Sequence, residues 1–133
     1  MNLDKILLYC DNLTLEAMEF ALNLAAKLSA KIFTIYVIDP KFIAQKVKLE
    51  NKDKEKIKDE IEDFAWKVLY EIEDRAALLD VKTSLLLLEG KPSRILREIA
   101  EGYEISLLII PRFSRLNLER FLAQNKERAV IIF

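Results

Sequence analysis

The chain has 133 residues, of which 52% are hydrophobic and 32% are charged, a composition that fits one soluble globular domain over residues 1–133. Its 21 Lys and Arg residues against 22 Asp and Glu residues give a net charge of −1, a balance that argues against a nucleic-acid partner. The chain contains no His, which excludes a Ser-His-Asp triad, a Cys-His dyad, a histidine general base and the common zinc sites.

Cysteine content and apolar runs bear on where the protein acts. The single cysteine, Cys10, cannot form an intramolecular disulfide, and residues 1–10 carry neither a basic leader nor a small-residue cleavage site. The apolar runs at residues 85–88 and 107–110 are far shorter than the roughly 20 residues that cross a bilayer. We therefore expect a cytoplasmic protein without a membrane partner, and the abundance of Lys, Glu and Ile hints at a thermophilic source.

The first third of the chain predicts a strand, a helix and a second strand. Residues 5–10 form a short apolar run before a turn, which is typical of a strand buried on both faces. After Thr14, a good N-cap residue, apolar side chains recur at helical spacing over residues 15–28. Residues 30–38 are rich in β-branched and aromatic side chains and stop before Pro40, which predicts the second strand.

A long, charged connection follows. It begins with a short predicted helix at residues 41–47 and a charged stretch at residues 48–56 that either starts the next helix or forms a mobile turn. A long amphipathic helix is predicted over residues 57–79. Its predicted apolar stripe consists of Ile57, Ile61, Phe64, Val68, Ile72, Ala76 and Leu79. Trp66 and Tyr70 lie off this stripe and either face a partner or pack against residues 41–47.

The next segment predicts a strand, a tight turn and a helix. Residues 81–88 form an apolar run, and Gly90 and Pro92 suit a turn that leads directly into a helix. Gly102 ends that helix. Its predicted apolar face consists of Ile95, Leu96, Ile99 and Ala100.

The last segment predicts two strands around a short helix. Residues 107–110 form an apolar strand that stops at Pro111, residues 116–123 form a short helix, and residues 129–133 supply a final strand. Strands that alternate with helices, and that are apolar throughout, indicate a parallel sheet covered on both faces. The predicted fold class is α/β, a three-layer sandwich.

Two groups of residues stand in an order that is typical of one family. The first is Asp11 at the end of the first strand, before an alanine-rich helix. The second is the turn at residues 89–92, followed by a helix and the strand at residues 107–110. Over nearly its whole length the chain resembles the universal stress protein family. The resemblance implies a five-stranded parallel sheet of order 3-2-1-4-5, the adenine nucleotide alpha hydrolase-like fold, and often a homodimer.

The family's ATP-binding motif has no glycine on this chain. In members that bind ATP, a glycine, two residues, a second glycine, nine residues and a third glycine with Ser or Thr follow the fourth strand. These positions fall on Pro111, Ser114, Gln124 and Asn125. Pro111 has no N–H to offer a phosphate, and residues with side chains resist the backbone conformations that glycine adopts. Only residues 126–128 precede the last strand, so the helix that normally follows is missing or shortened, and we expect no cofactor, ATP being the alternative.

The resemblance also implies candidate nucleotide-binding residues. In nucleotide-binding relatives an acid at the position of Asp11 and the backbone near Ile38 hold the adenosine part, and Gly90 is a further candidate beside them. The alternative for Asp11 is that it caps the following helix. Asp39 either pairs with Asp11 around Mg²⁺ or simply ends its strand, and the prediction is that no metal is bound.

The C-terminal segment is locally basic. It contains Arg112, Arg115, Arg120, Lys126 and Arg128 against Glu119 and Glu127. Arg112 and Arg115 are candidate anion-binding residues, and the alternative is a solvated basic face. Cys10 lies in an apolar strand without a partner base, so it is expected in the core.

The final strand predicts the oligomeric state. The family order places it at the edge of the sheet, where an apolar strand without proline or charge aggregates unless it is paired. We predict a homodimer through Ala129, Val130, Ile131, Ile132 and Phe133. The predicted function is a non-catalytic, stress-response module that acts through an unknown protein partner or a weakly bound small ligand. The alternative is an adenine-nucleotide-binding protein with slow ATP hydrolysis.

Overall fold

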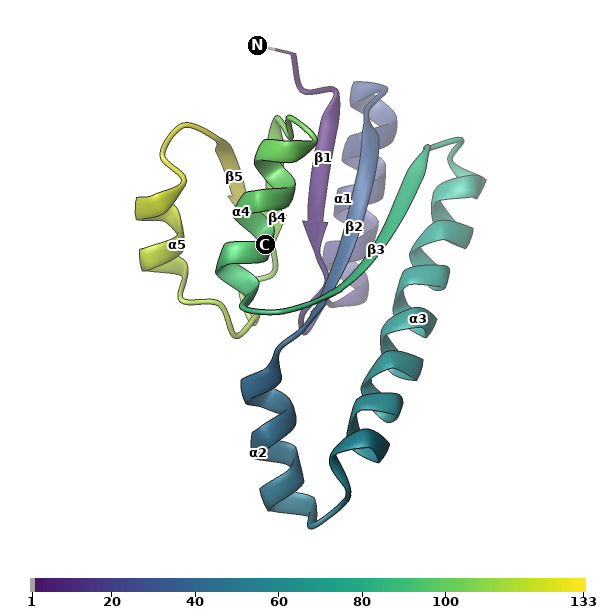
Figure 1. Ribbon diagram of the computed structural model, residues 1–133. Helices are drawn as coiled ribbons and strands as arrows, with labels where there is room; N and C mark the ends of the chain where they lie inside the picture. The colour runs from purple at the N-terminus through teal and green to yellow at the C-terminus, as the bar shows by residue number, and fades with distance from the viewer. Residues whose placement is uncertain (1) are drawn as a thin grey trace.

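A computed structural model describes residues 2–133, which contain five strands in one sheet and five helices (Figure 1). The strands are β1 (Lys5–Tyr9), β2 (Lys31–Ile38), β3 (Thr83–Glu89), β4 (Leu107–Ile110) and β5 (Ala129–Ile132). The helices are α1 (Leu15–Leu28), α2 (Pro40–Glu50), α3 (Lys54–Leu78), α4 (Pro92–Gly102) and α5 (Leu118–Gln124). The strand order is β3-β2-β1-β4-β5 and every neighbouring pair is parallel, which confirms the predicted fold class and order.

Alternate side chains of the central strands enter two separate cores. Ile6 and Leu8 of β1 pack with α1 and α3, whereas Leu7 and Tyr9 pack with α4 and α5. Burial on both faces, predicted for β1, is confirmed, and β2 and β4 are buried in the same way. The edge strands β3 and β5 are only partly buried, because each has a neighbouring strand on one side only.

The apolar stripe of α3 differs from the prediction at two positions. Phe64 is 58% exposed and Leu79, just beyond the helix, is 41% exposed, whereas Ala65 and Leu69 are fully buried. The buried stripe of α3 runs through Ile61, Ala65 and Leu69. Phe64 lies at the border of this stripe, and its ring meets the Tyr36 ring of β2 edge to face. Within residues 2–133 there is no helix long and apolar enough to cross a membrane.

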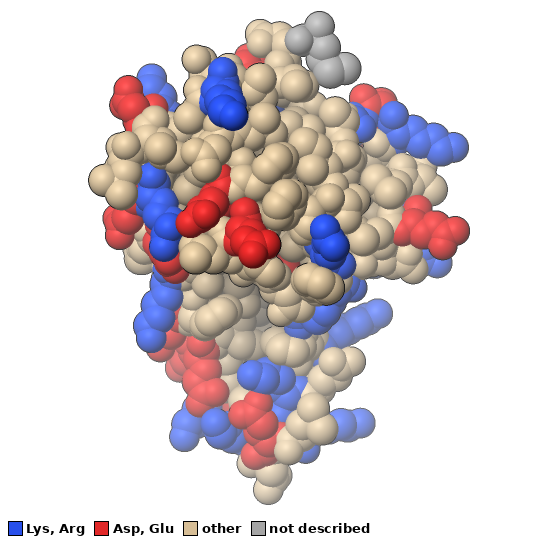
Figure 2. Space-filling model, turned by 180° about the vertical axis from the view of Figure 1, so that it is seen from behind, with Lys and Arg blue, Asp and Glu red and all other residues tan. Residues whose placement is uncertain are grey.

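The charged stretch at residues 48–56 is divided between two helices. Its first residues complete α2 and its last residues begin α3, so a short turn joins the two helices into a hairpin that projects beyond the sheet (Figure 1). Lys52 lies 3.4 Å from Glu50 and 3.3 Å from Glu60, which ties the two helices together. Figure 2 shows basic and acidic side chains interleaved over this part of the surface. The charge run is therefore a solvated, mixed-charge face.

Gly90 occupies a backbone conformation that side chains resist. Its φ is +152°, and an added Cβ would lie 3.2 Å from the side chain of Ile95. We expect Gly90→Ala to lower the free energy of unfolding by about 1–3 kcal/mol. Gly102→Ala is the matched control, since a Cβ there meets nothing within 4 Å. Urea denaturation of both variants checks this; equal losses of stability would contradict it.

Candidate functional site

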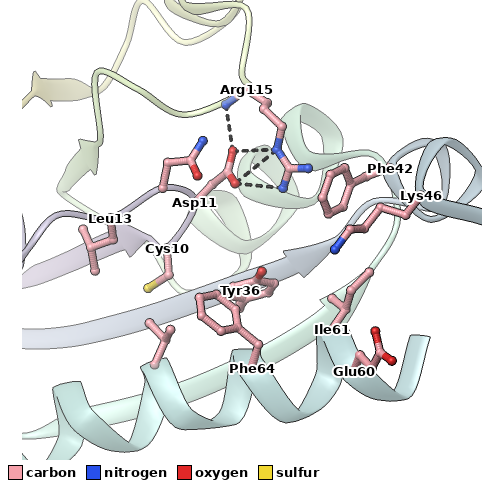
Figure 3. Close-up of a pocket in the computed structure, with 12 residues that line it drawn as sticks. Cys10, Asp11, Leu13, Tyr36, Phe42, Lys46, Glu60, Ile61, Phe64 and Arg115 are labelled. Atoms are coloured by element: carbon pink, nitrogen blue, oxygen red, sulfur yellow. Dashed lines mark hydrogen bonds and ion pairs between the residues drawn. The ribbon is translucent and has the colours of Figure 1, made fainter. Parts of the chain in front are cut away.

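A cavity of about 680 Å³ lies beside the carboxyl ends of β1 and β2 (Figure 3). Tyr36, Phe42 and Phe64 supply aromatic walls from β2, α2 and α3. The Tyr36 and Phe64 rings meet edge to face with centroids 6.3 Å apart. Lys46 and Glu60 complete the charged part of the lining together with Asp11 and Arg115. We call this cavity pocket 1.

Asp11 is bound by Arg115 rather than by the helix that follows it. The Arg115 Nη2 donates to Asp11 Oδ1 at 2.8 Å, and its backbone N–H donates to Oδ2 at 2.7 Å. The Arg115 Nε lies 3.2 Å from Oδ1 and 3.3 Å from Oδ2. The cap of α1 is Thr14, whose hydroxyl accepts from the Ala17 N–H at 3.1 Å. The expectation that Asp11 caps α1 is therefore wrong.

The Arg115 guanidinium also stacks on an aromatic ring. Its central carbon lies 3.8 Å from the centroid of Phe42, so the guanidinium is held between Asp11 and that ring (Figure 3). Asp11 is 5% exposed, and a buried carboxylate needs this kind of charged, bidentate partner. The contact joins the loop after β4 to both the end of β1 and the start of α2.

The two candidate anion-binding arginines do not share a site. Arg115 lines pocket 1, whereas the Arg112 guanidinium lies 5.9 Å from the exposed Phe113 ring. Arg128, further along the basic segment, pairs with Glu127 at 2.7 Å.

Four backbone N–H groups after β4 donate to acceptors inside the protein. Those of Arg112, Ser114 and Asn125 donate to the carbonyls of Phe133, Pro111 and Leu122 at 3.1, 3.0 and 3.2 Å. The Arg115 N–H donates to Asp11, as described above. Gln124 ends α5, and only a turn separates Asn125 from β5. The polar atoms here that are buried without a partner among residues 2–133 are Ser114 Oγ and Asn125 Oδ1.

The remaining candidate residues have local structural contacts. The Gly90 N–H donates to the carbonyl of Ile38 at 3.0 Å, which joins the ends of β2 and β3. Asp39 caps α2, since its Oδ1 accepts from the Lys41 N–H at 2.9 Å. Asp11 and Asp39 thus have separate partners, and no group of three or more potential metal-ligating side chains occurs within residues 2–133.

Cys10 lies in the core, as expected from the sequence. Burial raises the pKa of its thiol to about 12, so the nucleophilic thiolate is strongly disfavoured at neutral pH. Burial also raises the pKa of Tyr36, which lines pocket 1. The Tyr36 hydroxyl therefore stays protonated and can donate a hydrogen bond into the pocket.

Sequence reasoning missed most of the pocket walls. Tyr36 and Phe42 stand on either side of Asp39-Pro40, where a strand ends and a helix begins, and that position is the signal that identifies them. Trp66 and Tyr70 stack on each other with centroids 5.4 Å apart and are 36% and 52% exposed. Their role in binding a partner stays a prediction.

Known proteins share both the sequence pattern and the fold. The model of the Universal stress protein family matches residues 5–131. Universal stress protein MJ0531 of Methanocaldococcus jannaschii is 28% identical over 121 residues, 90% of this chain and 69% of that protein.

Two solved structures from the same family superimpose on the chain. One from Burkholderia pseudomallei has a TM-score of 0.77 at 20% identity and covers 98% of this chain and 96% of its own. One from Archaeoglobus fulgidus, in complex with dAMP, has a TM-score of 0.65 at 16% identity and covers 99% and 98%. The family match spans nearly all of the sequence, and the chain therefore belongs to the universal stress protein family.

Proposed function

We propose that the protein is a non-catalytic, homodimeric stress-response module that acts through protein contacts or by binding a small ligand weakly in pocket 1. In this proposal the loop after β4 offers no set of free backbone N–H groups to bind a triphosphate, and the protein does not hydrolyse ATP. The proposal has three parts, which concern the loop after β4, the chemistry of pocket 1 and the edge strand β5.

The main support for the absence of a triphosphate site is that four backbone N–H groups after β4 already have acceptors. A phosphate loop binds because several backbone N–H groups point into one concavity and have no other acceptor. In this chain Pro111 has no N–H, and those of Arg112, Ser114, Arg115 and Asn125 donate to internal acceptors. Turning them toward a triphosphate would break four native hydrogen bonds, so the loop does not fit that group.

Pocket 1 suits a planar ligand of low charge. Its aromatic walls favour stacking and edge contacts, while Asp11 is already neutralised by Arg115. The Archaeoglobus fulgidus relative was solved with dAMP, which supports an adenosine-type ligand for this pocket. In the free protein such a ligand meets the Asp11–Arg115 pair rather than an open carboxylate, which limits its affinity.

The edge strand supports the dimer. β5 has β4 on one side and no strand on the other within residues 2–133. Apolar side chains around it are exposed, with Ile132 at 37% and Leu122 at 40%. Two copies that pair antiparallel along β5 would cover both the free strand edge and these side chains.

A thermal-shift titration tests the ligand part. We expect adenosine to raise the melting temperature in a concentration-dependent way, since a ligand at ten times its Kd adds about 1.4 kcal/mol. ATP with Mg²⁺ is expected to act no more strongly than adenosine. Phe64→Ala, which trims an exposed pocket wall, should weaken the adenosine effect, whereas Phe113→Ala, which trims an exposed ring outside pocket 1, should not.

The second candidate function is adenine-nucleotide binding with slow ATP hydrolysis. The dAMP complex of the relative favours it, as does the presence of a pocket beside Asp11. A much larger shift with ATP and Mg²⁺ than with adenosine, together with release of inorganic phosphate, would establish this candidate and overturn the non-catalytic proposal.

A further inference from the structure

The sheet has a second open edge, formed by β3, which has β2 on one side and no strand on the other within residues 2–133. At the two ends of β3, the Ile32 N–H donates to the Lys82 carbonyl and the Gly90 N–H donates to the Ile38 carbonyl, both at 3.0 Å. Because a strand in a parallel ladder bonds to one neighbour through every second residue, the even-numbered residues of β3 face β2. The backbone groups that point to the open edge belong to Thr83, Leu85, Leu87 and Glu89.

This edge is long and apolar. β3 has 7 residues, and those before Glu89 are partly buried. Leu85 and Leu87 pack with the core of α1 and α3, whereas Leu86 and Leu88 pack with the core of α4 and α5. An open strand is normally interrupted by proline or charge, yet β3 contains no proline and its one charge lies at its last residue. The edge therefore suits the addition of another extended segment.

One flank of α3 borders this edge. The opposite flank faces α1 and α2, because Arg75 forms an ion pair with α1 at 3.7 Å and Phe64 lines pocket 1 together with part of α2. Trp66 comes two positions after Phe64 and nine before Arg75, so at roughly 100° per residue it points away from both. α3 lies beside β3 (Figure 1), and β3 is separated from β1 by β2. The stacked pair of Trp66 and Tyr70 is therefore on the side of the open edge.

The flank that carries Trp66 and Tyr70 is acidic. Steps of three and four positions place four carboxylates in line with the two rings. They belong to Glu55, Asp59, Glu62 and Glu73. None of the four has an ion-pair partner among residues 2–133. Lys58, at the border of this flank, already pairs with Glu89 of β3 at 3.2 Å. We call this surface the acidic flank.

The acidic flank distinguishes between two occupants of the edge. A second copy of the chain that paired antiparallel through β3 about a two-fold axis would bring its own acidic flank against this one, and like charges repel. A segment rich in arginine would instead meet carboxylates of opposite charge, and its guanidinium groups would stack on the exposed rings. Charge complementarity therefore favours a basic partner.

We propose that the open edge of β3 binds an extended, basic segment of a partner protein as an added strand. The backbone of the segment bonds to the outward groups of β3. Its arginine side chains stack on Trp66 and Tyr70 and pair with the carboxylates of the acidic flank. This inference rests on the proposed function, since it names the class of partner for the protein contacts, but it uses neither β5 nor pocket 1.

Trp66 is the one tryptophan of the sequence, so its fluorescence reports binding at this flank without a label. The probe is a capped peptide of alternating arginine and valine, as long as the 7 residues of β3. We expect a saturable change in Trp66 emission when the full chain is titrated with this peptide at low salt. Replacing every valine of the peptide by proline keeps its charge but removes N–H groups, and this peptide should bind at least about tenfold more weakly.

A substitution in β3 tests the backbone contact. Leu87→Pro removes an outward N–H and spares the ladder with β2, so it is expected to weaken peptide binding about tenfold. Leu87→Ala is the matched control, because it loses the same side chain from the core but keeps the N–H. Leu87→Ala should bind the peptide nearly as the parent protein does, and circular dichroism shows whether each variant is folded.

Surface substitutions test the acidic flank even if Leu87→Pro fails to fold. The double variant Glu62→Gln, Glu73→Gln is expected to weaken peptide binding about fivefold or more. The matched control is the double variant Glu101→Gln, Glu119→Gln, which removes two exposed carboxylates from α4 and α5 that also lack ion pairs among residues 2–133. This control should bind the peptide as the parent protein does.

Four results would overturn the inference. The first is an unchanged Trp66 emission at millimolar peptide. The second is equal binding of the proline-containing peptide, which would show charge attraction without strand addition. The third is equal weakening by the two double variants. The fourth is a dimer that Leu87→Pro dissociates, which would show that a second copy covers this edge.

The proposed function is measured separately from this edge. The mass of the dimer and the adenosine titration depend on β5 and pocket 1, so the loss of either effect with peptide binding retained would count against the proposed function alone. Absence of peptide binding in a protein that dimerises through β5 and responds to adenosine would count against the inference on β3 alone.

Discussion

Ile132→Pro is expected to turn the proposed dimer into a monomer while leaving the chain folded. The Phe133 N–H donates to the Ile110 carbonyl, and its own carbonyl accepts from the Arg112 N–H, so the backbone of Phe133 faces β4. Because hydrogen-bonding groups alternate along a strand, those of Ile132 point to the open edge. Proline at this position removes an outward N–H and spares the ladder with β4.

The effect on the dimer is large because symmetry doubles it. In an antiparallel pair about a two-fold axis, each substitution occurs twice, so two hydrogen bonds are lost and two proline rings oppose close approach. We expect the dissociation constant to rise by about 100-fold or more. Light scattering after size-exclusion chromatography should give the mass of two chains for the parent and of one chain for the variant.

A control variant distinguishes the effect of losing the backbone N–H from the effect of losing the side chain. Ile132→Ala keeps the N–H and loses only a side chain that is 37% exposed, so it should weaken the dimer far less than proline does. A parent protein that is monomeric at all concentrations, or an Ile132→Pro variant that remains dimeric, would refute pairing through β5.

Arg115→Ala is expected to lower the free energy of unfolding by about 2–3 kcal/mol. Asp11 is 5% exposed, and the substitution removes its charged, bidentate partner while the backbone N–H at position 115 remains. A buried carboxylate without a partner lowers the free energy of unfolding considerably. Because the Arg115 side chain is 42% exposed, water already weakens the pair, and the expected loss of stability is smaller than for a fully buried pair. Arg115→Lys should recover part of the stability, because an ammonium group keeps the charge but not the planar fork.

A double-mutant cycle isolates the contact itself. Asp11→Ala and Arg115→Ala should each destabilise the protein, and the double variant should lose at least about 1.5 kcal/mol less than the sum of the two losses. Urea denaturation at neutral pH measures all four proteins. Simple additivity would show that Asp11 and Arg115 act independently and that the pair does not hold the loop after β4 in place.

Short-range patterns determined the elements of this fold. Apolar runs marked β1, β2 and β4, and turn residues such as Gly90 and Pro92 marked the start of α4, because strand burial and turn conformation depend on neighbours in the sequence. The strand order followed from the family resemblance and was confirmed. The exact face of α3 was missed, since periodicity alone did not show that Ala65 rather than Phe64 belongs to the buried stripe.

The sequence by itself thus determined the α/β class and the family. Only the tertiary structure decided what the polar residues do. Asp11 and Arg115 are separated by 104 positions. A parallel sheet gathers the carboxyl ends of its strands at one edge, so side chains distant in sequence become neighbours there. Which of them pair and which remain free depends on side-chain geometry that no local pattern encodes.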